Sequence, residues 1–377
     1  MEKTKVKTLV RQIRGVSYKL EDLHNELDDN SVVLLRANNI DEGKINFDDV
    51  VYVDKSKVSD EQYLKYGDIL ICASSGSKNL VGKAASIRFN TECTFGAFCK
   101  VIRPKEGLDE YLSVYFQSPI YRRKISEVAI GVNINNIRNE HIDELDIPVF
   151  LNDEQASIVK KIHLIQEVIS NRKAELEKLD DLIKARFVEM FGDPNDTKRV
   201  SDSRHKIGEL CDVTKLAGFE FTEYINYQDS GEIIMLRGLN CKQGKLVLDN
   251  VKYIDRETSN KLPRSRLYVG DILMTYAGTI GDVAMVDEDD KYHLAPNVAK
   301  ISIVAKDMLN PTFLVHLFMY SHDYIMTFAS QVAQASINMQ KIRDFEYIIP
   351  SMEEQIEFEQ FANQVNKSKF GKLSTLL

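Results

Sequence analysis

Two long regions of the chain are built from short runs in which apolar and polar residues alternate. Examples are VVLLRA and KINFDDVVYV in the first half, and IIMLRG and KLVLDNVKYI in the second. Turn-forming triplets lie between these runs, DEG at residues 41–43 and KQG at residues 242–244. Alternation of this kind, bounded by glycine and polar turns, is typical of half-buried β-strands. The pattern therefore predicts two β-rich regions.

A different period follows each β-rich region. Residues 154–190 contain no proline or glycine, their apolar residues recur with a heptad spacing, and FGDP follows them as a stop signal. A second helix is expected from residue 353 onward, shorter than the first and antiparallel to it, because a heptad seam requires a partner helix. The residues expected to form this seam are Ile158, Ile162, Ile165, Ile169, Leu176, Leu179, Ile183, Phe358, Phe361 and Val365.

The two halves of the chain resemble each other. LLRANNI returns as MLRGLN, YGDIL returns as VGDIL, and INNIRNEHIDELDIPVFLNDEQ returns as INMQKIRDFEYIIPSMEEQ. These blocks keep their order at shifts of 200 to 203 positions. So long a period indicates a tandem duplication of a whole domain and not a solenoid of small repeats.

The amino-acid composition is typical of a globular protein, but it does not decide whether the chain binds nucleic acid. The 377 residues are 44% hydrophobic and 28% charged, with a net charge of −8 and five scattered cysteines. No apolar run reaches the roughly 18 residues of a membrane span, so no membrane contact is expected. An acidic chain argues against DNA, since phosphate contacts need lysine and arginine. Acidic helices can nevertheless coexist with a local basic surface.

The stretch GSKNLVGKA, residues 76–84, superficially resembles a nucleotide-binding loop. Such a loop has the pattern G-x-x-x-x-G-K-[ST], in which the hydroxyl binds magnesium. Here five residues separate the glycines, and Ala84 replaces the hydroxyl residue. The second half has GTIGDVA at the matching place, with Asp282 where Lys83 stands. A nucleotide hydrolase using residues 76–83 is therefore the weaker alternative, and no glycine-rich cofactor turn or other catalytic motif is present.

The ordered set of these blocks resembles the specificity subunit of type I restriction–modification systems. LLRANNI, YGDIL with its Ser/Gly loop, IPVFLNDEQASIV with FVEMFGDP, IGELCDVTKLAGFEF and IIPSMEEQ carry the resemblance. It implies an α+β fold of two tandem-duplicated, β-rich target-recognition domains joined by long antiparallel coiled-coil helices. The expected boundaries are 1–150 for the first recognition domain, 151–192 for the central helix, 193–351 for the second recognition domain and 352–377 for the short C-terminal helix.

The resemblance also implies a function and a set of partners. The chain would be a non-catalytic, cytoplasmic subunit that reads a bipartite target in double-stranded DNA. It would dock two methyltransferase subunits and the motor–nuclease subunits through its helices, which are long enough to separate two readers by one DNA turn of about 34–36 Å. The chain itself would hold no cofactor, because S-adenosylmethionine, ATP and magnesium would belong to the partners. The alternative of another class is a protein scaffold that makes no DNA contact.

Polar residues in matching loops are the candidates for DNA contact, because Lys, Arg, Asn, Ser and Thr bind base edges and phosphates. Each also has a purely structural interpretation, since asparagine, serine and glycine favour turns and caps. The candidates in the first half are Arg36, Asn38, Asn39, Ser74, Ser75, Lys78, Asn79, Lys83, Asn133, Asn135 and Asn136. Those in the second half are Arg237, Asn240, Lys242, Thr275, Tyr276, Thr279, Ser336 and Asn338.

Overall fold

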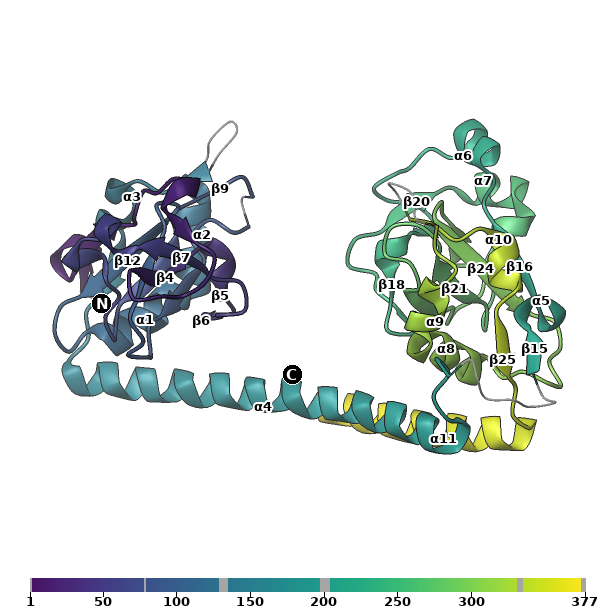
Figure 1. The fold of residues 1–377 in the computed structure, drawn as a ribbon. Helices are drawn as coiled ribbons and strands as arrows, with labels where there is room; N and C mark the ends of the chain where they lie inside the picture. The colour runs from purple at the N-terminus through teal and green to yellow at the C-terminus, as the bar shows by residue number, and fades with distance from the viewer. Residues whose placement is uncertain (1, 78, 129–134, 197–203, 331–334, 374–377) are drawn as a thin grey trace. The chain divides into compact units, whose positions relative to one another are not determined.

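The chain folds into two units, which we describe separately (Figure 1). The computed structural model describes residues 2–77, 79–128, 135–196, 204–330 and 335–373. Contacts between Cα atoms divide the chain into unit 1, Met1–Asn171, and unit 2, Arg172–Leu377. Each unit contains a four-stranded antiparallel sheet, a second sheet of three or four strands with one parallel pair, and a set of helices. The predicted α+β fold with two duplicated β-rich domains is confirmed.

Unit 1 is built on two sheets. The first has the order β10-β8-β12-β2 and is antiparallel throughout: β10 Ala84–Ser86, β8 Ile69–Cys72, β12 Cys99–Pro104, β2 Val10–Arg14. The second has the order β11-β4-β7-β3: β11 Cys93–Phe95, β4 Ser31–Leu35, β7 Val51–Asp54, β3 Leu23–His24. In the second sheet β11 runs parallel to β4.

Short strand pairs and helices complete unit 1. The pairs are β1 Lys3–Lys5 with β14 Asp146–Pro148, β5 Ile40–Asp41 with β6 Lys44–Ile45, and β9 Ser74–Ser75 with β13 Asn135–Asn136. The α-helices are α1 Asp109–Gln117, α2 Pro119–Val128, α3 Asn139–Asp143 and the first part of α4 Asn152–Phe191. The 3₁₀ turns are η1 Val6–Thr8, η2 Leu20–Asp22, η3 Ala37–Asn39, η4 Lys55–Lys57 and η5 Asp60–Gln62.

Unit 2 repeats this plan. Its main sheet has the order β16-β24-β21-β22: β16 Cys211–Lys215, β24 Val298–Ile303, β21 Ile272–Thr275, β22 Val283–Met285. The smaller sheet is β20 Lys252–Ile254, β17 Ile233–Leu236 and β23 Tyr292–Leu294, with β17 parallel to β23. The short pairs are β15 Arg204–Lys206 with β25 Glu346–Ile348, and β18 Cys241–Lys242 with β19 Lys245–Leu246.

The helices of unit 2 include the end of α4. The others are α5 Ile207–Leu210, α6 Gly218–Tyr224, α7 Arg256–Lys261, α8 Pro311–Tyr320, α9 His322–Met326, α10 Met339–Arg343 and α11 Met352–Leu373, with 3₁₀ turns η6 Gly238–Asn240 and η7 Pro263–Ser265. Strand order β22-β21-β24-β16 matches β10-β8-β12-β2 of unit 1, and β17–β23 matches the parallel pair β4–β11. The duplication seen in the sequence is thus a duplication of topology.

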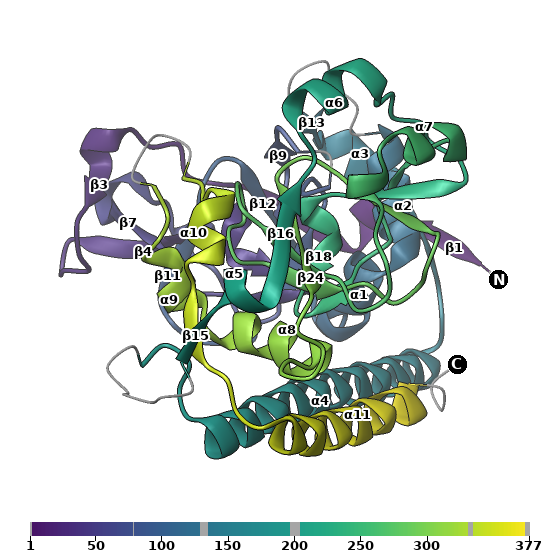
Figure 2. The same cartoon turned by 90° about the vertical axis from the view of Figure 1, so that its right-hand side faces the viewer.

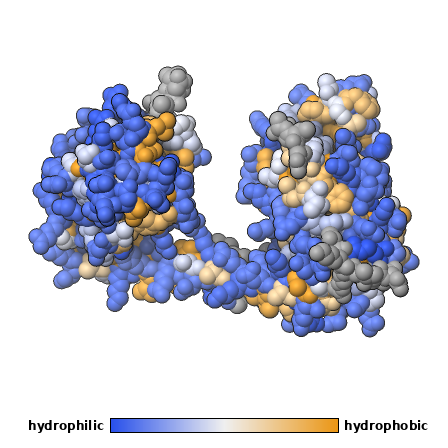
Figure 3. Space-filling view, in the orientation of Figure 1, coloured by the Kyte–Doolittle hydropathy of each residue, from blue (hydrophilic) through white to orange (hydrophobic). Residues whose placement is uncertain are grey.

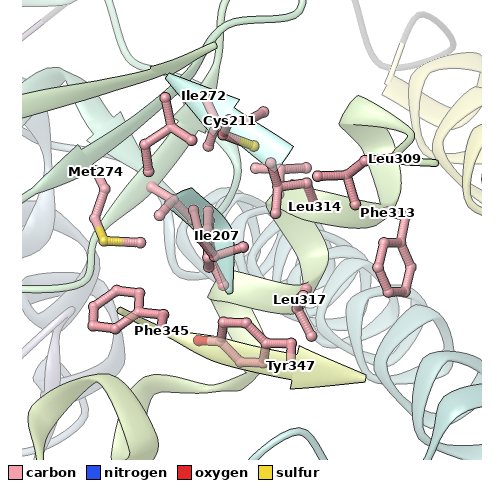
Figure 4. Close-up of a cluster of buried hydrophobic side chains, with 14 of the residues drawn as sticks. Ile207, Cys211, Ile272, Met274, Leu309, Phe313, Leu314, Leu317, Phe345 and Tyr347 are labelled. Atoms are coloured by element: carbon pink, nitrogen blue, oxygen red, sulfur yellow. The ribbon is translucent and has the colours of Figure 1, made fainter. Parts of the chain in front are cut away.

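The largest buried cluster of the described residues lies in unit 2, between the main sheet and the helices (Figure 4). Ile272 and Met274 of β21 contribute to it from the sheet, and Phe313 and Leu317 contribute from α8. Phe345, which directly precedes β25, joins them. The alternation along β21 places these side chains on one face of the sheet, so a strand of hydrophobic residues has one face covered by helices.

Helix α4 begins and ends where local chemistry dictates. Asp153 and Glu154 lie in its first turn, where negative charge interacts favourably with the helix dipole. Gly192 follows the helix with a positive φ of 82°, and its N–H donates to the carbonyl of Val188 at 2.8 Å. Pro194 then prevents further helix. The helix extends two residues before and one residue after the predicted range of 154–190.

Helix α11 lies beside the C-terminal part of α4 in both views (Figures 1 and 2). Arg186 of α4 forms an ion pair with Glu357, and Asp180 forms one with Lys369. Moving toward the N-terminus of α4 therefore means moving toward the C-terminus of α11, and the two helices are antiparallel as predicted.

A glutamine fastens the start of each long helix to its own unit. Gln155 donates from Nε2 to the carbonyl of Phe150 at 2.9 Å. Gln355, at the matching position, is fully buried and donates to the carbonyls of Pro350 and Met308, both at 2.9 Å. Its Oε1 also accepts the N–H of Asn310 at 2.8 Å. The same residue type thus makes one anchoring bond in unit 1 and three in unit 2.

Candidate functional site

The loop that contains residues 76–83 joins two antiparallel strands. Gly82 N–H donates to the carbonyl of Cys72 at 2.8 Å, and Cys72 N–H donates to the carbonyl of Lys83 at 2.9 Å. The chain then enters β10, whereas a phosphate loop leads into a helix N-terminus. The loop is therefore a long hairpin connection, and the nucleotide-hydrolase alternative loses its structural basis.

Gly82 permits helix α2 to approach this loop closely. Its φ is +80°, and a Cβ built there would lie 2.6 Å from Cγ2 of Ile125. Arg122, one turn earlier on α2, donates to the carbonyl of Val81 at 2.7 Å and to that of Asn79 at 2.9 Å. The Arg122 side chain thus holds the loop through backbone carbonyls, so this contact does not depend on the loop's own side chains.

The structure brings two separate groups of candidates together in unit 1. Strand β13 pairs with β9 so that Asn136 lies opposite Ser74 and Asn135 opposite Ser75. Ile137 N–H donates to the carbonyl of Ala73 at 2.8 Å and extends this pairing. Asn79 and Asn136 are exposed, while Ser74, Ser75 and Lys83 are half-buried. Lys78 and Asn133 lie outside the described residues.

Unit 2 builds the same junction with other side chains. Ala277 forms a bridge with Ser336, and Ile337 N–H donates to the carbonyl of Tyr276 at 2.8 Å. Gly281, with a φ of +86°, donates to the carbonyl of Thr275 at 3.0 Å, as Gly82 does to Cys72. The backbone frame is shared, but the loop between the matched positions is shorter in unit 2.

Two of the candidates in this junction hold the fold. Thr275 is fully buried; its hydroxyl donates to the carbonyl of Thr279 and accepts the N–H of Asp282 at 3.0 Å. Asn338 is exposed, and its side chain accepts the N–H of Lys341 at 2.9 Å as the cap of α10. Thr279 is exposed, and Tyr276 and Ser336 are half-buried.

The asparagines that end η3 and η6 are also structural. Asn39 and Asn240 are 1% and 0% exposed. Asn39 accepts the N–H of Arg36 at 2.8 Å and donates to the carbonyl of Asn46 at 3.0 Å. Asn240 makes the equivalent bonds with Arg237 and Val247. The turn interpretation applies to both, so neither belongs to the exposed candidate surface.

The arginines before these turns are partly exposed. Arg36 donates to a carboxylate oxygen of Asp49 at 3.0 Å, and Asn38 donates to the same oxygen at 2.7 Å. Arg237 donates to the carbonyl of Asn250 at 2.8 Å. Unit 2 therefore has an amide where unit 1 has a carboxylate, which leaves the positive charge of Arg237 without this neutralising partner.

A cavity of about 500 Å³ in unit 2 unites several candidates. Arg237, Lys242 and Thr279, all three candidates from the sequence, line it. Two further lining residues, Phe221 and Asn297, were not among the sequence candidates. Phe221 ends the motif IGELCDVTKLAGFEF, and Asn297 lies in no repeated motif. Asp282 and Tyr227 also line the cavity, which therefore combines two cations, a carboxylate, hydroxyls, an amide and aromatic rings. Such a set is suitable for hydrogen bonds with a polar ligand.

The helix seam is buried only where a second helix is present. Ile183, Phe358 and Val365 are 3%, 0% and 7% exposed, Leu179 and Phe361 are partly buried against the same cluster, and Leu176 is half-buried. In unit 1, Ile158 and Ile162 are half-buried, whereas Ile165 and Ile169 are 58% and 49% exposed. The predicted seam is thus filled along α11 and open along the middle of α4.

The cysteines are buried thiols, as expected for core residues. All five are free and inaccessible. Burial raises the pKa of Cys93, Cys211 and Cys241 to about 12, so these thiols are neutral near pH 7. Within the described residues no group of three or more His, Cys, Asp or Glu side chains is placed to hold a metal ion. None of the helices described combines the length and apolar character that crossing a membrane requires.

Comparison with known families identifies the architecture. Residues 17–179 and 204–369 each match the type I restriction modification DNA specificity domain. The chain belongs to this family. The two matches follow the two structural units, so the family domain occurs twice, as the duplication requires.

Individual relatives agree with this assignment. The specificity subunit of the type I restriction enzyme StySPI from Salmonella potsdam is 40% identical over 180 residues, which are 48% of this chain and 39% of that protein. The EcoKI specificity subunit from Escherichia coli strain K12 is 34% identical over 286 residues, 73% of this chain and 61% of its own. The chain therefore spans between 39% and 61% of the length of these two relatives.

A solved structure supports the fold. It comes from a study of complex assembly and conformational transition in the type I R-M system. The alignment covers 99% of this chain and 93% of that chain, with a TM-score of 0.54 and 14% sequence identity. The arrangement of elements is similar, while the side chains have diverged.

Proposed function

We propose that this chain is the DNA-recognition subunit of a type I restriction–modification complex. Each unit reads one half of a bipartite target in double-stranded DNA, and the chain performs no chemistry of its own. Two methyltransferase subunits and the motor–nuclease subunits dock on the helices and bring S-adenosylmethionine, ATP and magnesium. Such a complex acts on chromosomal DNA in the cytoplasm.

One observation carries this proposal: the two units present different side chains on the same backbone frame. Gly82 and Gly281 make the same hydrogen bond at the end of the loop, and Ile137 and Ile337 make the same hydrogen bond beside it. The accessible tips differ, with Asn79 in unit 1 and Thr279 in unit 2. Conserved geometry with different tips is expected of two readers that distinguish different base sequences.

The accessible candidates define the proposed DNA surfaces. Buried Asn39, Asn240 and Thr275 act behind them by holding the turns. In unit 1 the surface consists of Arg36, Asn38, Ser74, Ser75, Asn79, Lys83 and Asn136. Three further candidates are adjacent to these in sequence: Asn135, which pairs with Ser75, and Lys78 and Asn133, which lie outside the described residues. In unit 2 it consists of Arg237, Lys242, Tyr276, Thr279, Ser336 and Asn338, of which exposed Asn338 also caps α10.

The acidic net charge of −8 fits a division of labour between the chain and its partners. Helix α4 carries eight acidic and seven basic side chains and is nearly neutral, so most of the acidic excess lies elsewhere in the chain. Sequence-independent grip on the phosphates depends on positive charge. Much of that grip is then supplied by the partner subunits, while the recognition surfaces supply selectivity.

The helices supply the docking surfaces. A groove of about 770 Å³ runs between α4 and α11, lined by Leu182, Arg186, Glu189, Glu357, Phe361 and Gln364. Its mixture of charge, amide and aromatic surface is suited to a protein partner, since aromatic residues and arginine are enriched in such interfaces. The exposed seam residues Ile165 and Ile169 provide apolar area on the same helix.

Mapping of adenine methylation across the host genome, with and without the gene, tests the proposal. We expect one split motif to disappear when the gene is removed. Asn79→Ala should then relax the half read by unit 1, and Thr279→Ala the half read by unit 2. Lys261→Ala, on α7 and outside the cavity, is the control for a change of surface charge. An unchanged map would contradict DNA guidance and favour the scaffold without DNA contact.

A further inference from the structure

One position beside the loops has the same backbone role in both units but very different side chains. Ala73 and Ser74 donate their N–H groups to the carbonyl of Phe98, at 2.9 and 3.0 Å. In unit 2, Tyr276 N–H donates to the carbonyl of Asn297 at 3.0 Å. Phe98 directly precedes β12, and Asn297 directly precedes β24, the matching strand.

The bonds one step earlier confirm that the two positions match. Gly96 N–H donates to the carbonyl of Leu35 at 2.9 Å, and Ala295 N–H donates to that of Leu236 at 3.2 Å. These bonds extend the parallel pairs β11–β4 and β23–β17. Each turn is therefore held on both sides, by the parallel strand and by the segment that follows β8 or β21. The backbone position from which the Phe98 or Asn297 side chain projects is thus fixed.

Phe98 is 69% exposed, although its backbone is held by these hydrogen bonds. Burial of a phenylalanine side chain stabilises a fold, so this exposed ring contributes little to folding. Figure 3 shows hydrophobic surface on the side of unit 1 where Figure 1 labels β9. The backbone of Phe98 lies next to the polar pair Ser74 and Asn136.

Asn297 also points to a ligand. It is exposed, has a left-handed φ of +67°, and lines the 500 Å³ cavity together with Arg237, Lys242 and Thr279. Among the residues that the structure describes, its carboxamide has no hydrogen-bond partner, while its backbone N–H donates to the hydroxyl of Tyr276 at 3.3 Å. An unused amide donor and acceptor therefore face the cavity.

We propose that Phe98 and Asn297 are a matched pair of base-reading residues, which rests on the proposed DNA recognition. Phe98 contacts the 5-methyl group of a thymine, and Asn297 forms two hydrogen bonds with the N6 and N7 atoms of an adenine. Apolar side chains recognise the thymine methyl in the major groove, and asparagine recognises adenine there. The same frame position then distinguishes bases by apolar contact in one unit and by hydrogen bonds in the other.

The first test compares methylation maps of strains that express the full chain with its partner subunits. Phe98→Ala should make one thymine in the half read by unit 1 degenerate and leave the other half unchanged. Phe98→Leu, which keeps apolar surface, should retain most of the preference. Asn297→Ala should relax one adenine in the half read by unit 2. Leu20→Ala, at a residue 89% exposed on η2, is the control and should change neither half.

The second test uses the purified complex and duplexes of the mapped target. Deoxyuridine replaces each thymine of one half in turn, which removes only the methyl group. One replacement should weaken binding by about fivefold in the wild type and have no effect in Phe98→Ala, since a single contact contributes on the order of 1 kcal/mol. For Asn297 the same experiment replaces each adenine of the half read by unit 2 in turn with 7-deazaadenine, which lacks N7. One replacement should weaken binding in the wild type and have no effect in Asn297→Ala.

The outcomes separate this inference from the proposed function. A bipartite wild-type motif that Phe98→Ala and Asn297→Ala leave intact would overturn the base-reading pair alone. Loss of affinity in Phe98→Ala without any uridine-sensitive position would overturn the thymine contact. Absence of any motif and of DNA binding in the wild type would overturn both proposals.

Discussion

Phe187 of α4 stacks on Phe313 of α8, with ring centroids 5.5 Å apart and an interplanar angle of 18°. Phe358 of α11 contacts the Phe187 ring edge-on, with ring centroids 5.2 Å apart. Phe187 is fully buried, so one side chain connects the helix pair to the core of unit 2. The packing of the long helices and the folding of the domain are therefore energetically coupled.

Replacement of this ring should destabilise unit 2 strongly. Phe187→Ala removes a fully buried ring and leaves a cavity, which costs about 3–5 kcal/mol in free energy of unfolding. Val188→Ala, at the next position of the same helix and 37% exposed, is the matched control and should cost less than about 1 kcal/mol. Urea unfolding followed by circular dichroism measures both. Equal losses would show that the ring does not couple the helices to the domain.

Arg103 and Asp68 form the most enclosed ion pair of unit 1, with side chains 18% and 2% exposed and atoms 2.7 Å apart. Arg103→Ala leaves a buried carboxylate unpaired, which should cost about 3–5 kcal/mol. The pair Arg11–Glu61 is 63% and 56% exposed, so Arg11→Ala should cost about 1 kcal/mol or less. Thermal unfolding of the two variants provides the comparison, and a smaller loss for Arg103→Ala would refute the argument.

Arg122 should keep the loop at residues 79–83 of unit 1 well ordered. Arg122→Ala removes two hydrogen bonds to loop carbonyls, and we expect a modest loss of about 1–2 kcal/mol in stability. Amide hydrogen exchange at residues 79–83 should become faster, and only the target half read by unit 1 should relax. Arg123→Ala makes the same change of charge at an exposed neighbour and should leave exchange in the loop unaltered. Identical exchange in both variants would exclude the bracing role.

Two histidines should make unit 2 less stable in mild acid. Burial lowers the pKa of His293 and of His316 below the ordinary value of 6.5. The folded state therefore favours the neutral ring, and the unfolded state binds more protons below pH 6.5. Stability should be fully present above that pH and decline as pH falls below it.

Unfolding by urea at pH 7.5 and pH 5.5 measures this dependence. His316→Gln should reduce the difference between the two pH values, because the substituted residue does not titrate. His322→Gln replaces an exposed histidine and should leave the difference unchanged. A difference that persists undiminished in His316→Gln would assign the acid sensitivity to other groups.

Much of the architecture could be predicted because it depends on local pattern and on repetition. The heptad period and the Gly192–Pro194 stop signal define α4 to within two residues at its start and one at its end. The repeated blocks define two copies of one domain. Ile183 of the predicted seam is buried, as expected from its position in the heptad.

The detailed surface could not be predicted in the same way. The pairing of Ser74 with Asn136 joins residues about 60 positions apart, and no local signal marks such a contact. Asn39 and Asn38 are adjacent and identical in type, yet only Asn39 is fully buried. Phe98 and Asn297 lie in FGAFC and LAPNV, two segments with little sequence similarity. Only the backbone hydrogen bonds show that the two residues occupy matching positions.

The glutamine anchor at the start of α4 acquires mechanical significance because α4 is a lever. Its 40 residues correspond to a rod of about 60 Å. A rotation of about 10° at the Gln155 end would displace the far end of that rod by about 10 Å. The hydrogen bond from Gln155 to Phe150, the burial of Val159 in the core of unit 1 and the ion pair between His163 and Glu110 resist that rotation. A small local adjustment of these contacts would therefore have the longest reach along the helix.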